Sequence, residues 1–509
     1  MYPGAVAREA PDRPAVVMAG SGEVITFAEL DARSNQFAQF LRARGVGPRG
    51  SMALFAENHP RFLEIMWGAQ RAGLYYTAVN SHLNADDAGY IVDDCDATVF
   101  VSTAALSAVA TQIDGSVAPT VQSRLLLGGT ADGWENYEDV VGAFPGDPVS
   151  DEGEGEFMLY SSGTTGRPKG IKREVTLAPM GSYERGALGL ATLLGMGPGD
   201  SYLCPAPLYH SAPLAWSMSA QRLGCTVVVM EHFDAEDCLR LIEQHRITHV
   251  QFVPTMFVRL LKLPPEVRAR YDTSSLKAVV HAAAPCPAEV KRQMIEWWGP
   301  IIYEYYSATE GMGATFINSE EALRKPGSVG KVMMGVLHVL DENGNELGPN
   351  EIGTITFSGG YKFEYYKDPA KTAEAVDAQG RGTVGDVGYV DEDGYLFLTD
   401  RKAFMIISGG VNIYPQEAEN VLVTHPKVFD VAVLGVPNAD LGEEVKGVVQ
   451  PVDFSAAGPE LEAELIAYCQ SKLSAYKCPR TIDFVETLPR LDTGKLYKQE
   501  LRRRYWPAM

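Results

Sequence analysis

The sequence predicts an α/β protein with a large N-terminal domain of stacked parallel-sheet α/β subdomains, a β-rich subdomain, and a small α+β C-terminal domain. With 509 residues the chain is too long for one ordinary core, so two or three domains are expected. Apolar strand patterns alternate with amphipathic helix patterns from residue 24 to residue 303, which is typical of parallel sheets covered by helices. Short segments separated by turn signals follow at 327–399, and a second α+β pattern completes the chain.

A β-α-β rhythm fills the first part of the chain. Residues 24–25 predict a strand that leads into a helix, because Thr26 and Glu29 form a capping box before apolar residues at helical spacing, and Gly45 ends this helix. A second helix is expected over 60–73. The remaining strands are predicted at 51–55, 75–79, 98–102, 124–127 and 157–160.

The same rhythm resumes after an acidic linker at 147–156. It predicts strands at 226–230, 249–253, 278–281 and 301–303, with a helix at 235–245. In the last part, helices are expected at 415–421 and 461–474, and strands at 431–436, 445–451 and 481–484. We therefore place an N-terminal domain at 1–400 and a C-terminal domain at 401–509.

The overall composition excludes several classes of protein. A net charge of −21 argues against nonspecific nucleic-acid binding, which needs a basic surface. The seven cysteines contain no Cys-x-x-Cys pair, so no zinc site or disulfide framework is indicated and a cytoplasmic location is expected. No apolar run approaches the roughly 20 residues of a membrane helix, and no signal peptide is apparent. We therefore expect no integral membrane segment.

One stretch, Tyr160-Ser161-Ser162-Gly163-Thr164-Thr165-Gly166-Arg167-Pro168-Lys169-Gly170, has the composition of a polyphosphate-binding loop. Its glycines allow close backbone approach, and its N–H groups, hydroxyls and lysine bind anions. An ordinary turn is the alternative. A Walker A loop is disfavoured, because Pro168 precedes Lys169 and Gly170 follows it. The full string resembles the phosphate loop of the acyl-adenylate-forming (AMP-binding) superfamily, which includes bacterial acyl-CoA synthetases and fatty-acid–CoA ligases.

Further stretches resemble the same family in the family's order, so that the resemblance spans Tyr160 to Lys495. Small residues after a strand, as at 282–285, let a flat ring lie against the backbone, and an acidic turn residue such as Asp386 can chelate a ribose diol. The resemblance implies that ATP or AMP is bound by Ser161, Ser162, Gly163, Thr164, Thr165, Lys169, Ala283, Ala284, Pro285, Glu304, Tyr305, Tyr306, Thr309, Asp386, Arg401 and Lys495.

The resemblance also implies three catalytic residues, Lys495, Glu310 and His210. Magnesium prefers oxygen ligands and few protein carboxylates, so Glu310 fits as its ligand together with Thr164. Lys495 follows Thr-Gly and would offset the repulsion between a carboxylate and a triphosphate. His210 would contact the acyl group, although a lone histidine is more often packed in a core.

The family's C-terminal domain is mobile and turns between two half-reactions. By resemblance, Ser408, Gly409 and Gly410 line the path of CoA, and the hinge lies at Lys402 and Ala403. The chain departs from the family in three places. Ala403 stands where Lys or Asp is common, Tyr305 and Ser307 stand where glycine is usual, and Thr-Val-Gly-Asp at 383–386 replaces Thr-Gly-Asp.

These features predict ATP-dependent activation of a hydrophobic carboxylic acid (fatty, aromatic, or polycyclic such as a sterol-derived acid) through acyl-AMP to acyl-CoA, with Mg²⁺ as the metal. The candidate acyl pocket is bulky and apolar, and Tyr305 adjoins it. Its residues are Tyr209, His210, Trp216, Phe252, Val253 and Met312. Two alternatives remain, namely loading of a carrier-protein phosphopantetheine and a nucleotide-binding protein without catalysis. A homodimer is compatible with the sequence.

Overall fold

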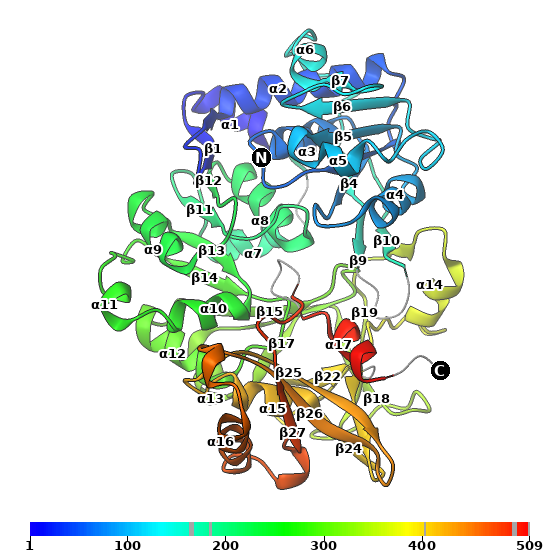
Figure 1. Cartoon of the computed structure of the whole chain (residues 1–509). Helices are drawn as coiled ribbons and strands as arrows, with labels where there is room; N and C mark the ends of the chain where they lie inside the picture. Colours follow the sequence, from blue (N-terminus) through cyan, green and yellow to red (C-terminus); the bar gives the residue numbers. More distant parts are fainter. Residues whose placement is uncertain (162–166, 183–185, 402–403, 491–495, 507–509) are drawn as a thin grey trace.

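The computed structural model describes residues 1–161, 167–182, 186–401, 404–490 and 496–506, and all structural statements below concern these residues. Figure 1 shows helix-covered sheets of the N-terminal domain at the top and left, and the C-terminal domain at the bottom. The predicted fold class is confirmed. No helix in the described ranges has both the length and the apolar character needed to cross a membrane.

The first sheet is entirely parallel and has the order β7-β6-β5-β3-β4-β8. Such a sheet needs cover on both faces, in agreement with the complete burial of its inner strands β4 and β5. The strands are β3 (Ser51–Phe55), β4 (Tyr75–Val79), β5 (Val99–Thr103), β6 (Ser123–Leu127), β7 (Glu135–Asn136) and β8 (Glu156–Phe157). The helices of this region are α1 (Pro3–Glu9), α2 (Phe27–Ala43), α3 (Phe62–Arg71), α4 (Ala85–Asp94), α5 (Ser107–Ala110) and α6 (Tyr137–Val141).

The predicted capping box at the start of α2 is confirmed. The Glu29 N–H donates to Thr26 Oγ1 at 3.2 Å, and the Thr26 N–H donates to Glu29 Oε2 at 2.8 Å. Two of the helix's otherwise unpaired N-terminal donors are thereby satisfied.

The second sheet has thirteen strands in the order β18-β19-β21-β22-β17-β16-β15-β14-β13-β11-β12-β1-β2. Its half from β1 to β15 is parallel apart from the β1–β2 pair, and every pair from β15 to β18 along the sheet is antiparallel. The strands are β1 (Pro14–Met18), β2 (Val24–Thr26), β11 (Ser201–Cys204), β12 (Thr226–Val229), β13 (His249–Phe252), β14 (Ala278–His281), β15 (Ile302–Ser307), β16 (Ala314–Ile317), β17 (Ser328–Met334), β18 (Val336–Leu340), β19 (Gly353–Ser358), β21 (Asp386–Val390) and β22 (Leu396–Arg401). The predicted β-rich subdomain therefore continues the α/β sheet instead of forming a separate one.

Helices along this sheet carry much of the site described below. They are α7 (Ala187–Leu193), α8 (Ser211–Arg222), α9 (Ala235–Gln244), α10 (Pro254–Leu261), α11 (Pro265–Arg268), α12 (Ala288–Trp298) and α13 (Ser319–Arg324), whereas α14 (Pro369–Ala375) packs against the separate strand β20 (Glu364–Tyr365).

The strand predicted at 157–160 is divided between two sheets. Residue Phe157 ends β8, which pairs with β4, whereas β9 (Leu159–Ser161) forms a three-stranded antiparallel sheet with β10 (Lys169–Lys172) and β20 (Glu364–Tyr365). The apolar residues at 157–160 are continuous in sequence, so the division into two strands is seen only from the different strands with which β8 and β9 pair.

The C-terminal domain has its own hydrophobic core around a five-stranded sheet. Its elements are β23 (Ile406–Ser408), β24 (Val411–Ile413), α15 (Pro415–Leu422), β25 (Val428–Asn438), β26 (Gly442–Pro451), α16 (Pro459–Gln470), β27 (Thr481–Phe484) and α17 (Lys498–Tyr505). Lys262 of the N-terminal domain links the two domains, because its ammonium donates to the Phe429 carbonyl at 2.9 Å and to the Val428 carbonyl. Burial lowers the pKa of Lys262 to about 8.

Candidate active site

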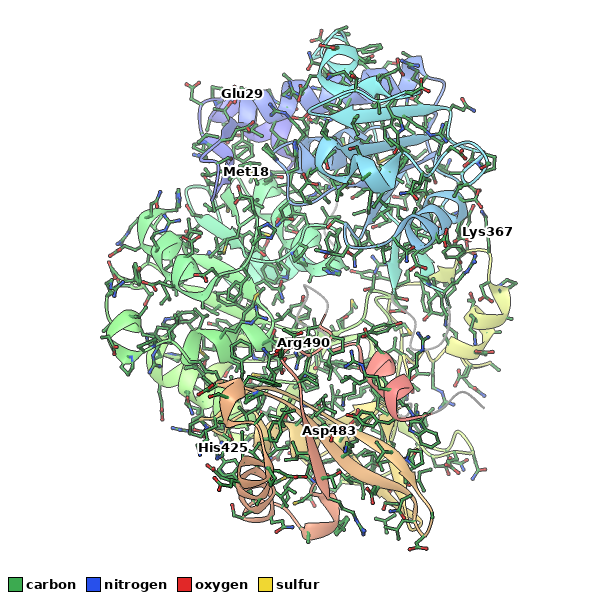
Figure 2. All side chains as sticks on the ribbon, viewed as in Figure 1. Met18, Glu29, Lys367, His425, Asp483 and Arg490 are labelled. Carbon is green, nitrogen blue, oxygen red and sulfur yellow. The ribbon has the colours of Figure 1, made fainter. Side chains whose placement is uncertain are left out.

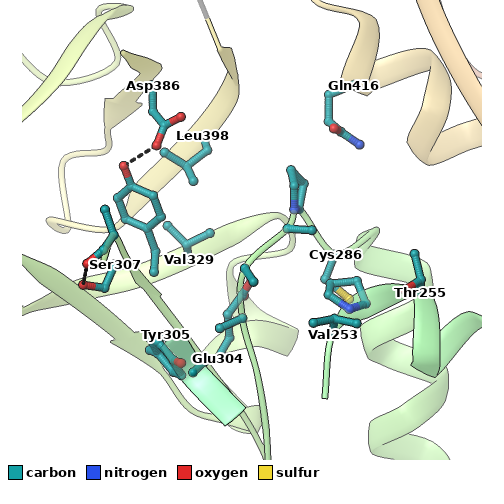
Figure 3. Close-up of a pocket in the computed structure, with 18 of the residues that line it drawn as sticks. Val253, Thr255, Cys286, Glu304, Tyr305, Ser307, Val329, Asp386, Leu398 and Gln416 are labelled. Carbon is teal, nitrogen blue, oxygen red and sulfur yellow. Dashed lines mark hydrogen bonds between the residues drawn. The ribbon is translucent and has the colours of Figure 1, made fainter. Parts of the chain in front are cut away.

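A cavity of about 1580 Å³ lies between the two domains. Its floor is formed where three neighbouring parallel strands end, since Val253 follows β13, Ala282 follows β14, and Ala308 follows β15. The carboxyl ends of parallel strands are the usual ligand-binding edge of an α/β sheet. Figure 3 shows Gln416 of the C-terminal domain facing this edge, with Thr255 and Cys286 of the N-terminal domain on the same side of the cavity.

Asp386 lies at one end of the cavity, at the start of β21. Gly385 has a φ of +83°, which lets the Thr-Val-Gly turn deliver Asp386 into the strand. The Tyr306 hydroxyl donates to Asp386 Oδ2 at 2.6 Å, as the dashed line in Figure 3 shows. Arg401 is the register partner of Asp386 on β22. This end therefore presents a fixed, hydrogen-bonded carboxylate.

The residues predicted to hold adenine form a ledge after β14. Ala283, Ala284 and Pro285 all line the cavity, and Ala283 has a φ of +74°, an uncommon conformation for a residue other than glycine. Such strained backbone clusters at ligand-binding sites.

A buried charged pair supports this ledge from behind. Lys291 of α12 donates to the Glu304 carboxylate of β15, and both side chains are almost fully buried. Burial raises the pKa of Glu304, and the charge of Lys291 opposes this increase. His281 lies 3.8 Å from Glu304, and neither of its ring nitrogens has a hydrogen-bond partner in the described part of the chain. Burial holds the pKa of His281 well below its ordinary value of 6.5, so the ring is neutral at pH 7.

Glu310 lies at the centre of the cavity wall and is buried. The Tyr365 hydroxyl donates to Glu310 Oε1 at 2.8 Å, and the ammonium of Lys169 lies 5.0 Å from the centre of the Tyr365 ring. Tyr365 thus couples the predicted phosphate-binding lysine to the predicted metal ligand. Within the described ranges, no cluster of three or more His, Cys, Asp or Glu side chains is arranged to hold a metal ion. A single buried carboxylate fits Mg²⁺, which completes its coordination with water and phosphate oxygens.

Two residues that the motifs did not identify contribute to this wall. Tyr365 lies in the two-residue strand β20, so it carried no sequence signal, whereas Arg173 follows Lys169 by four positions, the alternation expected on one strand face. The Arg173 guanidinium donates to the Thr309 carbonyl and lies 3.9 Å from Glu156. Arg173 therefore fixes the turn that carries Thr309 and Glu310.

Several predicted residues fall outside the described ranges, namely Ser162, Gly163, Thr164, Thr165, Lys402, Ala403 and Lys495. Their neighbours in the sequence are described. Ser161 and Lys169 are register partners and both line the cavity, as do Arg490 and Leu496 on either side of 491–495. Figure 2 places Arg490 near the boundary between the two domains.

The predicted acyl-pocket residues separate into two groups. His210, Trp216, Val253 and Tyr305 line the cavity, whereas Tyr209, Phe252 and Met312 do not. Phe252 is fully buried in the core, 5.5 Å from the ring of Phe257, whereas Val253, the residue after β13, packs in the same core and also lines the cavity. Tyr209 is buried beside His210, with ring centres 4.3 Å apart, and Met312 packs in the core of the antiparallel half of the sheet.

The predicted CoA-path residues also lie away from the cavity. Ser408 ends β23, Gly409 and Gly410 form the turn to β24, and none of the three is among the lining residues of the cavity.

Comparisons with known proteins agree with this geometry. The AMP-binding enzyme family matches residues 5–366, and the AMP-binding enzyme C-terminal domain matches 417–495. The chain is 32% identical to a feruloyl-CoA synthase of Amycolatopsis sp, over 99% of this chain and 98% of the relative. It is 30% identical to the long-chain-fatty-acid–CoA ligase FadD13 of Mycobacterium tuberculosis, over 94% of this chain and 93% of the relative. Its structure resembles ATP-bound MatB from Rhodopseudomonas palustris with a TM-score of 0.81 and 29% identity, covering 99% of each chain. The chain belongs to the family of AMP-binding enzymes.

Proposed function

We propose that this enzyme is an acyl-CoA synthetase that activates a hydrophobic carboxylic acid with ATP and transfers the acyl group to CoA. One observation carries the proposal. A single cavity joins the Asp386–Tyr306 pair, the Glu310 carboxylate and an apolar wall that contains Trp216 and Val253. The relatives named above act on aromatic and fatty acids as CoA ligases, which supports this substrate class.

In the first half-reaction, a carboxylate oxygen attacks the α-phosphorus of ATP, and the bond to pyrophosphate breaks. Asp386 holds the ribose hydroxyls, the ledge at 283–285 receives adenine, and Lys169 binds phosphate. Thr164 and Glu310 would hold Mg²⁺, which would supply positive charge beside the phosphates. Lys495 supplies a second cation where charge increases as pyrophosphate leaves. Arg490 and Leu496 line the cavity, and this supports the proposal that the segment between them serves the site.

In the second half-reaction, the CoA thiol attacks the carbonyl of acyl-AMP, the acyl–phosphate bond breaks, and AMP leaves. We place the boundary between the moving parts at 400/401 and the hinge at Lys402 and Ala403, between β22 and β23. Rotation about this hinge would bring Ser408, Gly409 and Gly410 to the cavity, from which the described arrangement separates them. We also propose a cytoplasmic location, where ATP and CoA are available. The seven free cysteines are consistent with such a reducing compartment. We also propose a homodimer, which a measurement of the molar mass by light scattering would test.

The test is pyrophosphate release from ATP over a panel of acids, from acetate through benzoate and ferulate to long fatty acids, with and without CoA. We expect release to require a hydrophobic acid and to yield acyl-CoA and AMP. Lys495→Ala should lower the rate of release at least 100-fold. The exposed Lys371→Ala is the matched control and should leave the rate unchanged. Pyrophosphate without thioester would indicate a carrier-protein acceptor, and no release with any acid would contradict the proposal.

A further inference from the structure

Helix α8 carries one continuous wall of the cavity, from the proposed acyl-binding end to its C-terminus. His210 is the N-cap residue of the helix, which lines the cavity with Ser211, Pro213 and Met218 and with Ala212, Ala215, Trp216, Ser219 and Arg222. Residues three and four apart share one face of a helix, so these positions form a stripe along its whole length. Twelve helical residues span roughly 18 Å. The cavity therefore has an arm long enough for an extended acyl chain.

The middle of this arm is aromatic. Tyr305 projects from β15 toward α8, where its hydroxyl oxygen lies 3.4 Å from Trp216 Nε1. Glu304 points to the opposite face of the strand, toward α12. Tyr305 and Trp216 thus bridge the sheet and the helix beside the arm. This part of the arm therefore favours a narrow or flat substrate.

The far end of the arm contains a polar cluster, with Met218 and Phe157 as apolar neighbours of its Tyr76 side chain. The Arg222 guanidinium binds Glu154 with two hydrogen bonds, Nη1 to Oε1 at 2.9 Å and Nη2 to Oε2 at 2.7 Å, and both side chains are nearly fully buried. Gln70 donates to the same carboxylate and accepts a hydrogen bond of 2.6 Å from the Tyr76 hydroxyl. Gln70, Tyr76, Ser219 and Arg222 all line the cavity.

This cluster carries no net charge. Burial raises the pKa of Glu154, but hydrogen bonds from Arg222 and Gln70 outweigh it and hold this pKa below its ordinary value. Glu154 is therefore ionised at pH 7 and neutralises Arg222. A substrate that ended in a methyl group would place it against hydrogen-bonding groups that had lost water. A second carboxylate would bring an uncompensated charge to a buried site.

We infer that the preferred acid is an elongated, mainly apolar molecule that carries a neutral hydrogen-bonding group, such as a hydroxyl or a carbonyl, at the end opposite its carboxylate. This inference rests on the proposed function and specifies its substrate. The Ser219 and Tyr76 hydroxyls are the groups at the end of the arm that would meet the terminal group of the acid.

The test compares acids of equal length in the pyrophosphate assay, with ATP and CoA present. Dodecanoic acid, ω-hydroxydodecanoic acid and dodecanedioic acid are compared, then the corresponding hexadecanoic series. At the chain length that the enzyme prefers, we expect kcat/KM for the ω-hydroxy acid to exceed that for the unsubstituted acid and that for the diacid by roughly tenfold. This factor corresponds to one buried hydrogen bond. Ser219→Ala and Tyr76→Phe should each reduce this preference severalfold.

Ser217→Ala is the matched control, because Ser217 lies on the same helix, is buried, and does not line the cavity. It should keep the preference for the hydroxylated acid. Equal or better turnover of the unsubstituted acids by the unmodified enzyme would overturn the inference and leave the proposed function intact. A preference that survives both Ser219→Ala and Tyr76→Phe would overturn the assignment to this cluster. No pyrophosphate with any acid would instead refute the proposed function.

Discussion

Replacement of Lys291 by methionine tests whether the buried pair behind the adenine ledge supports the N-terminal domain. Methionine has a similar length but no charge, so Lys291→Met leaves the Glu304 carboxylate without its cation in a site where only 4% of the side chain is exposed. Loss of one partner from a buried ion pair costs about 3–5 kcal/mol, because the remaining charge has lost both water and its partner. We therefore expect a clear loss of stability.

The corresponding change in melting temperature follows from the size of the domain. Unfolding entropy is about 2.1 cal/mol/K per residue, or roughly 0.8 kcal/mol/K for a domain of about 400 residues. A loss of about 4 kcal/mol then lowers Tm by about 5 °C. The double variant with Glu304→Gln should recover much of this loss, because no uncompensated charge remains.

The assay is thermal unfolding at pH 7 followed by circular dichroism, with the Michaelis constant for ATP measured in parallel. Lys371→Met is the control, since Lys371 forms an exposed pair with Glu374 at 2.6 Å on α14. Exposed pairs contribute less than about 1 kcal/mol, so Tm should fall by no more than about 1 °C. Equal Tm values for Lys291→Met and Lys371→Met would refute the reasoning.

Three further changes give separate tests. Because the pKa of His281 is lowered in the folded protein, the unfolded chain binds more protons below pH 6.5, and the free energy of unfolding decreases as pH falls. His281→Phe should reduce the pH dependence of this free energy by up to about 1.4 kcal/mol per pH unit, measured by urea titrations at pH 5–7. An unchanged pH dependence would contradict the assignment. Tyr306→Phe removes the donor to Asp386 and should raise KM for ATP by roughly tenfold while KM for the acid stays constant. Thr26→Ala breaks the capping box with Glu29 and should cost about 1 kcal/mol, or about 1 °C in Tm, with unchanged kinetics.

The sequence by itself determined the fold class, the positions of many strands and helices, and the motif series. These depend on short-range information, because hydrophobic periodicity distinguishes helices from strands and a capping box is complete within four residues. The strands β3, β4, β14 and β27 and the capping box of α2 accordingly match their predicted positions. Asp386 and Glu310 both line the cavity, because Asp386 begins β21 and Glu310 lies in the turn that follows β15.

Only the tertiary structure decided which side chains face the cavity. Phe252 and Val253 are apolar neighbours that pack in the same core, yet only Val253 also lines the cavity, because it follows β13 at the edge of the sheet. Tyr365 reaches Glu310, and Glu154 neutralises Arg222 at the end of the arm, through contacts between segments far apart in the chain. No local pattern encodes such pairs, because their free energy arises only when packing removes both groups from water.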